Sequence, residues 1–283
     1  MTTQTNKLEA YRGEQLQELI NHITSVTHPE KIFLLTACAN QSQSESIFWD
    51  RPVHLPGPVH YYFLILKQPG DLTHNDPLQD RIENRYGHST TLTAIVIAAE
   101  VFNTWLKEAH PFAIRVSQSA LLCYDAGNLL QENPPTCDAG KLSATLQKEY
   151  LFYQRQASEF MIGADLYRMR ANHNLSLFNI HQSAEQLFIA IIRWITGFRC
   201  NTHNMDKLYR YSRCFSSDLA RLFPRDTKSE KEIFDTLQGA YADPRYKKDY
   251  HVKPEMVNIL FKRVEKLQAI TEELIQPQLT VKQ

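Results

Sequence analysis

The first 130 residues alternate amphipathic stretches with short apolar runs. Residues 8–23 place leucine and isoleucine mostly at helical spacing, which predicts an amphipathic helix. Continuous apolar runs at 31–39 (KIFLLTACA) and 60–67 (HYYFLILK) predict buried strands, and a third such strand begins at residue 90. Helices that alternate with apolar strands are typical of a small α/β or α+β layer.

Turn residues divide these elements. The polar, Pro-rich stretch 41–60 is predicted to be a loop with little regular structure. Residues 75–87 are predicted to form a helix, because a proline lies in the first turn and a glycine closes the last. A short helix is expected around 101–109, and residues 112–125 contain a further strand.

Beyond a loop rich in Asn, Pro and Gly at 128–140, the pattern changes to long amphipathic helices without a convincing strand. This loop is the expected domain boundary. Gly197 suits the end of one helix, and Ser229 with Glu232 three residues later forms a capping-box pattern at the start of another. The predicted helices cover residues 143–171, 174–196, 204–215, 216–222, 229–243 and 254–275.

The composition agrees with two folded domains. Of 283 residues, 43% are hydrophobic and 22% charged, which is enough apolar material for one or two cores. The predicted fold class is an α+β domain at 1–130 followed by an all-α bundle at 143–276. The apolar runs are shorter than the roughly 20 residues of a membrane span, and the polar N-terminus lacks a signal-peptide core. Five scattered cysteines are interpreted as free thiols, so a cytoplasmic location is expected.

The net charge is zero, but it is unevenly distributed. Residues 1–145 hold 10 Lys/Arg against 15 Asp/Glu, a net charge of −5, and residues 146–283 hold 21 against 16, a net charge of +5. A basic half can attract polyanions such as RNA, and a solvated helical surface explains a charge of this size equally well.

The histidines do not predict a metal site. The chain has eleven, and none has HExxH or comparable ligand spacing, so neither a metal nor another cofactor is expected. His173 and His181 are eight residues apart on a predicted helix, where packing is the favoured interpretation.

Three segments of the second half carry a family resemblance: IHQSAEQLFIAIIRWITGF (180–198), THNMDKL (202–208) and FDTLQGAYADPRY (234–246). Their order and spacing resemble the HEPN domain, a bundle of about five helices, over roughly residues 145–275. The resemblance implies a homodimer through these helices and a helix-entry position for His203.

Many members of that family carry an Arg followed by four to six residues and a His, and such pairs line a dimer cleft and cleave RNA without a metal. This sequence has Arg245-Tyr-Lys-Lys-Asp-Tyr-His251 in the corresponding place. Histidine can transfer a proton near neutral pH, and arginine can stabilise the charged phosphorane. Lys247 and Lys248 add positive charge for phosphates.

Two residues depart from the pattern of the active members. Tyr246 stands where they usually carry a small polar residue, and Pro244 bends the chain before the arginine. A structural role is also open for Arg245, which could cap the preceding helix or pair with Asp243 or Asp249.

We therefore favour a non-catalytic nucleotide- or RNA-binding module, with Arg245, Tyr246, Lys247 and Lys248 at the ligand surface. The alternative is a metal-independent endoribonuclease that uses Arg245 and His251 as catalytic residues. A purely structural interaction protein is the third reading.

The N-terminal half is similar in element order to nucleotidyltransferases of the DNA polymerase beta type, which often precede HEPN domains. Active members need a Gly-Ser turn and three carboxylates on two further strands, which bind two Mg²⁺ ions. Here Thr36-Ala37-Cys38 replaces the turn, His60 and Tyr62 occupy the Asp-x-Asp positions, and the third strand has no acid before Glu100. The resemblance implies an inactive domain kept as a scaffold, partner surface or ligand sensor.

Overall fold

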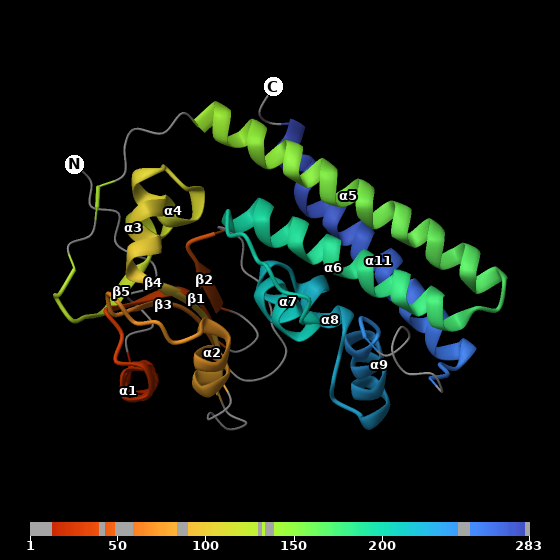
Figure 1. Cartoon of the computed structure of the whole chain (residues 1–283), viewed down its shortest axis with the longest axis horizontal. Helices are drawn as coiled ribbons and strands as arrows, with labels where there is room; N and C mark the ends of the chain where they lie inside the picture. The colour runs from red at the N-terminus through yellow and green to blue at the C-terminus, as the bar shows by residue number, and fades with distance from the viewer. Residues whose placement is uncertain are drawn as a thin grey trace. The chain divides into compact units, whose positions relative to one another are not determined.

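The computed structural model describes residues 13–39, 43–48, 59–83, 90–129, 132–133, 139–242 and 250–280. The chain divides into two compact units, unit 1 (Met1–Asp138) and unit 2 (Ala139–Gln283). Unit 1 combines helices with a mixed sheet, and the described residues of unit 2 form helices and loops without a strand (Figure 1). The predicted fold class, an α+β region followed by an all-α region, is confirmed.

The sheet of unit 1 is built around its first strand. Its strands are β1 (Lys31–Ala39), β2 (Gln43–Ser46), β3 (Val59–Lys67), β4 (Thr90–Ala98) and β5 (Leu121–Asp125). β3 lies antiparallel along one edge of β1 and parallel to β4. β5 pairs with residues 31–34 of β1 and β2 with residues 36–39, so these two short strands follow each other along its other edge.

Helices cover both faces of this sheet. α1 (Glu14–Thr27) and α2 (Asn75–Glu83) lie on one face, and α3 (Ala99–Lys107) and α4 (Pro111–Ser119) lie on the other (Figure 1). Phe63 of β3 packs with α1 and α2, and Phe33 of β1 lies 5.9 Å from the ring of Phe102 in α3. Because both faces are buried, β3 is a continuous apolar run rather than an alternating one.

Two elements of unit 1 differ from the sequence predictions. Residues 43–46, within the predicted loop, form β2, because main-chain pairing with β1 does not require an apolar side-chain pattern. Residues 111–119 form the helix α4, which begins with a proline at its first position, so only 121–125 of the predicted strand region is a strand.

Unit 2 is arranged around one central helix. Its helices are α5 (Ala139–Met169), α6 (His173–Thr196), α7 (Met205–Ser212), η3 (Arg213–Phe215), α8 (Ser217–Leu222), α9 (Lys228–Gly239) and α11 (Pro254–Thr280). α6 contacts α5, α7, α9 and α11 and is buried on most of its circumference (Figure 1). A helix that is apolar on nearly all sides is a buried helix. None of the described helices combines the length and the apolar content that crossing a bilayer requires.

The predicted caps can be compared with the structure at the C-terminus of α6 and the N-terminus of α9. Gly197 ends α6 with a φ of 77°, the left-handed conformation that favours glycine, so the predicted C-cap is confirmed. The capping box of α9 uses Thr227 and Glu230, so the predicted Ser229–Glu232 box is wrong. Both pairs have the same spacing, but the helix begins two residues earlier, and Thr227 then lies at the N-cap.

Candidate functional site

The predicted Arg-x5-His motif lies between α9 and α11 in the chain, and only its last two residues, Tyr250 and His251, are among the described residues. Arg245, Tyr246, Lys247 and Lys248 lie outside them. The side chain of His251 is exposed, three residues before the start of α11. The structure describes the residues on both sides of the motif, Tyr241 before it and Tyr250–Val252 at its end.

A single side chain holds the flank at His251. Asn174 Nδ2 donates to the carbonyl of Tyr250 at 2.5 Å, and the amide of Val252 donates to Asn174 Oδ1 at 3.3 Å. Asn174 lies in the first turn of α6, whose N-cap is Asn172. The main chain is thus fixed on both sides of His251 while its imidazole remains open to solvent.

The other flank contains a buried polar group that we call the Glu185 cluster: His181, Glu185, His203 and Tyr241. Glu185 Oε2 lies 2.9 Å from His203 Nδ1 and 3.5 Å from His181 Nε2. The ring of Tyr241 stacks on His203, with centroids 4.7 Å apart and 14° between the planes, and lies 5.8 Å from the ring of His181. Tyr241 follows α9 directly, so the cluster supports the chain four residues before Arg245.

Hydrogen bonding assigns the protons in this cluster. His181 Nδ1 lies 2.8 Å from the carbonyl of Leu237, and a carbonyl can only accept, so the proton is on Nδ1. Burial raises the pKa of Glu185, but His181 and His203, which both face the carboxylate, outweigh this effect and hold that pKa below its usual range. The carboxylate is therefore ionised at neutral pH although its side chain is only 4% exposed.

Both flanks are anchored on one face of α6. Asn174, His181 and Glu185 are separated by seven and four residues, and these intervals return to the same side of a helix. This face contacts Tyr250 and Val252 on one side of the motif and, through the Glu185 cluster, Tyr241 on the other.

Most of these anchors are not evident from the sequence. His181 is fully buried, as packing requires, but its bond to Leu237 and its approach to Glu185 appear only in the structure. The four-residue spacing of His181 and Glu185 was the available signal. His203 precedes Asn204, the N-cap of α7, which agrees with the helix-entry interpretation.

The basic residues of unit 2 are partly neutralised. Arg225 Nη1 lies 2.6 Å from Asp206 Oδ1, and its guanidinium stacks 3.8 Å from the ring centre of Phe234. Arg210 Nε lies 2.9 Å from the other oxygen of Asp206. These two arginines therefore form ion pairs within unit 2, and Arg225 also makes a cation–π contact. The net charge of +5 therefore overstates the cations available to a ligand.

Unit 1 brings together the strand positions at which the nucleotidyltransferase resemblance expects carboxylates. His60 Nε2 lies 3.0 Å from Thr93 Oγ1, and the rings of His60 and Tyr62 are 4.6 Å apart. Glu100 lies at the start of α3, where its carboxylate accepts a hydrogen bond from the backbone amide of Gly70. Among the described residues, no group of three His, Cys, Asp or Glu side chains is placed to hold a metal ion.

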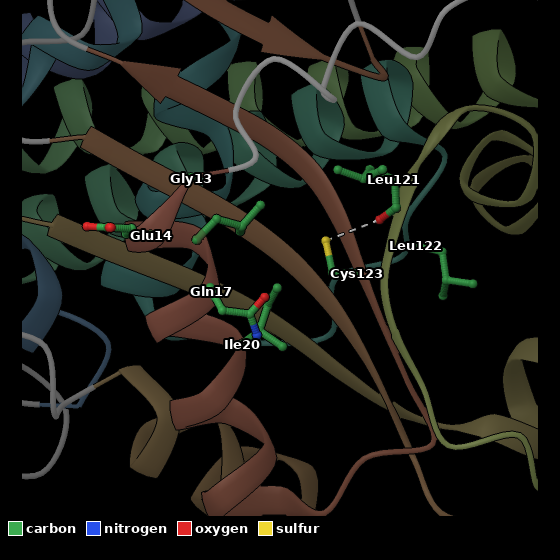
Figure 2. Close-up of a pocket in the computed structure, with 8 residues that line it drawn as sticks. Gly13, Glu14, Gln17, Ile20, Leu121, Leu122 and Cys123 are labelled. Carbon is green, nitrogen blue, oxygen red and sulfur yellow. Dashed lines mark hydrogen bonds between the residues drawn. The ribbon is translucent and has the colours of Figure 1, made fainter.

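A pocket of about 500 Å³ opens between the first turns of α1 and strand β5 (Figure 2). The thiol of Cys123 donates a weak hydrogen bond to the carbonyl of Leu121 at 3.5 Å. Glu14 and Cys123 lie on opposite sides of the pocket (Figure 2), so its polar groups do not converge as a catalytic site requires. The lining residues are Gly13, Glu14, Leu16, Gln17, Ile20, Leu121, Leu122 and Cys123.

Comparison with known proteins identifies one family. Residues 150–274 match the family model of the HEPN domain, which confirms the resemblance of the second half. No curated protein matches the chain. A crystal structure of a nucleotidyltransferase-like protein from Exiguobacterium sibiricum 255-15 aligns over 92% of this chain and 78% of its own, at 10% identity and a TM-score of 0.30. A TM-score this low does not establish a common fold, so the family match concerns unit 2.

Proposed function

We propose that unit 2 is a non-catalytic RNA- or nucleotide-binding module whose ligand surface is the segment from Arg245 to Lys248. Arg245, Lys247 and Lys248 supply cations for phosphates, and Tyr246 supplies an aromatic face. The HEPN match over residues 150–274 supports this proposal, because it includes the whole segment.

The anchoring of both flanks on α6 is the observation that carries the proposal. Asn174 fixes the main chain around His251, and the Glu185 cluster holds Tyr241. A segment whose two ends are fixed loses less conformational entropy when a ligand orders it, so affinity improves without additional contacts. The exposure of His251 also favours a ligand surface over a core role.

Fluorescence anisotropy with a labelled single-stranded RNA tests the proposal. We expect Arg245→Ala to weaken binding about tenfold, the loss of one charge-assisted hydrogen bond, and to flatten the dependence of affinity on salt. The exposed Arg221 of α8 gives a matched control, since Arg221→Ala removes the same charge elsewhere in unit 2. Equal effects of the two substitutions would indicate nonspecific attraction and contradict the proposal.

A metal-independent endoribonuclease is the second candidate. The fixed, exposed position of His251 favours it, because a proton-transfer group must be held in place and reach its substrate. The departures at Pro244 and Tyr246 argue against it.

A gel assay of tRNA cleavage in EDTA separates the two candidates. Cleavage by the wild-type protein that is lost in both Arg245→Ala and His251→Ala would establish the nuclease and retire the non-catalytic module. We expect intact RNA at high protein excess, together with binding that His251→Ala leaves unchanged and Arg245→Ala weakens.

A homodimer through unit 2 is part of the same proposal. Large apolar side chains of α5 are exposed, among them Phe152 (52%) and Ile162 (64%). Two copies of α5 running antiparallel about residue 157 would place Phe152 opposite Ile162 and Arg155 opposite Glu159 of the second copy. This complementarity of charge and apolar surface is what a two-fold interface requires.

Light scattering after size-exclusion chromatography tests the dimer. We expect Ile162→Glu to convert the dimer to a monomer, because it places two unpaired charges in the apolar contact. Leu72→Glu changes a 92% exposed leucine of unit 1 in the same way and should leave the mass unchanged. A wild-type monomer at micromolar concentration would contradict this interface.

For unit 1 we propose an inactive nucleotidyltransferase-like domain at residues 1–130, which serves unit 2 (the HEPN-like bundle at 143–276) as scaffold. An imidazole and two hydroxyls at His60, Tyr62 and Thr93 support this, because they do not supply the anions that Mg²⁺ needs. Calorimetric titration with Mg²⁺ and ATP should give no heat of binding in unit 1. Cys38, Cys123, Cys200 and Cys214 are thiols rather than disulfides, which fits a reducing, cytoplasmic setting.

A further inference from the structure

The imidazole of His203 is fixed in place although it is exposed. Its side chain is 62% accessible to solvent, yet Nδ1 is bonded to the buried carboxylate of Glu185 at 2.9 Å. One face of its ring is covered by the parallel ring of Tyr241. The exposed part is therefore mainly the other face of the ring and its Nε2 edge.

The electrostatics of the cluster make this arrangement stable. Glu185 is ionised, so His203 Nδ1 carries a proton and donates it to the carboxylate. His181 approaches the same oxygen from the interior, and its own Nδ1 is committed to Leu237. His203 is thus held by a charge-assisted hydrogen bond and a ring stack, which restrict rotation about its side-chain bonds.

Packing alone does not explain an aromatic ring at this position. Glu185 needs a donor on its solvent side, and a glutamine amide would supply one. The ring buries only part of its surface, on Tyr241, and presents the remainder to water. A flat, preorganised aromatic face is the feature by which proteins bind unpaired bases, because every base has a π-face to stack on it.

We propose that His203, backed by Tyr241, is the stacking platform for one unpaired nucleobase of the RNA or nucleotide whose phosphates Arg245 and its neighbours bind. This inference rests on the proposed function, which it refines by separating a base-binding element from a phosphate-binding element. Tyr241 joins the two in sequence, since it contacts His203 and lies four residues before Arg245.

The test compares two labelled hexamers of equal charge: hexauridylate and an abasic ribose-phosphate oligomer. For the wild-type protein, we expect anisotropy to show about tenfold tighter binding of hexauridylate, the contribution of one stacked base. The abasic oligomer reports phosphate binding alone, so it separates the two elements.

Two variants assign the difference. His203→Gln keeps a donor for Glu185 and removes the ring, so hexauridylate should fall to the affinity of the abasic oligomer, which itself should not change. Arg245→Ala should weaken the binding of both oligomers and leave their ratio intact. Circular dichroism at increasing temperature checks that each variant is folded.

The outcomes distinguish the two proposals. Equal binding of the two oligomers by the wild-type protein, or a preference that survives His203→Gln, overturns the stacking platform and leaves the phosphate site standing. Failure of the wild-type protein to bind either oligomer overturns the proposed function and the platform together.

Discussion

Each unit buries a histidine in a polar cluster, and the two clusters differ in the partner that the histidine meets. In unit 1, His60 is buried and meets the hydroxyl of Thr93. In unit 2, His181 is buried and meets the ionised carboxylate of Glu185, which also holds the exposed His203. A neutral cluster contributes hydrogen bonds to the fold, whereas a buried charge can orient a second group at the surface.

The position of each cluster adds to this difference. His60 on β3 bonds to Thr93 on the neighbouring strand β4. The Glu185 cluster includes Tyr241, which follows the end of α9 and comes four residues before Arg245 in the sequence. The comparison indicates that the His60 side chain is closed off from solvent within unit 1, whereas unit 2 holds an exposed imidazole, His203, that a ligand can reach.

The largest expected effect tests the role of the buried charge. Glu185→Ala should destabilise unit 2 by about 3 kcal/mol, because it removes the charged acceptor that binds His203 and leaves a space beside the buried His181. Native-state hydrogen exchange of the α6 amides measures this for unit 2 separately. Glu265→Ala removes an exposed carboxylate from α11 and serves as the control. A loss below 1 kcal/mol for Glu185→Ala would show that the cluster is not a charged anchor.

A smaller effect is expected from the neutral cluster. His60→Ala should destabilise unit 1 by about 2 kcal/mol, through the lost hydrogen bond to Thr93 and the space left by the ring. RNA affinity should be unchanged, since unit 1 is proposed to be a scaffold. Exchange of the β3 amides and RNA anisotropy measure the two consequences. A drop in RNA affinity with unit 1 still folded would give this cluster a functional role.

The anchor at His251 should have a smaller effect on stability than on binding. Asn174→Ala removes two hydrogen bonds to the main chain at the start of α6, with an expected loss of about 1 kcal/mol. RNA affinity should fall about fivefold, because the released segment must then be ordered on binding. Asn179→Ala, on the same helix, is the control. If the Asn174→Ala variant binds RNA as tightly as the wild-type protein, the proposal that Asn174 preorganises the ligand surface is wrong.

The smallest effect concerns acid stability. The pKa of Glu185 is held below its ordinary value of 4.5, so the carboxylate stabilises unit 2 fully above pH 4.5 and progressively less as pH falls below it. His181 and His203 face this carboxylate, as do Tyr241 and the carbonyl of Leu237. Glu185→Gln should reduce the slope of stability against pH below pH 4.5. An unchanged slope would assign the acid response of unit 2 to other groups, such as Glu149, whose pKa is also lowered.

Local sequence patterns predicted most of the secondary structure. The apolar runs of β1 and β3 and the amphipathic periodicity of α6 identify buried elements, because burial on known sides requires apolar residues at known intervals. The sequence did not predict β2, because this short edge strand is held by main-chain hydrogen bonds to β1, and such bonds require no apolar pattern in its own residues. The start of α9 was misplaced because two capping boxes compete within three residues.

The candidate site was predicted only in part. The sequence located the motif at Arg245–His251 and the neutral residues at His60 and Tyr62, because both are read from residue type and spacing. It did not identify Asn174 or Glu185 as anchors, since each acts on a residue more than ten positions away in the chain.

By itself, the sequence determined the order of an α+β region and a helical region, the resemblance of the second half to HEPN domains, and the absence of carboxylates from the expected strand positions. Those features follow from local periodicity and residue identity. Only the tertiary structure decided that one face of α6 holds both flanks of the motif, and that a buried Glu185 orients an exposed His203. The physical reason is that hydrogen bonds and ion pairs between distant residues depend on how the helices pack, and no interval in the chain specifies that packing.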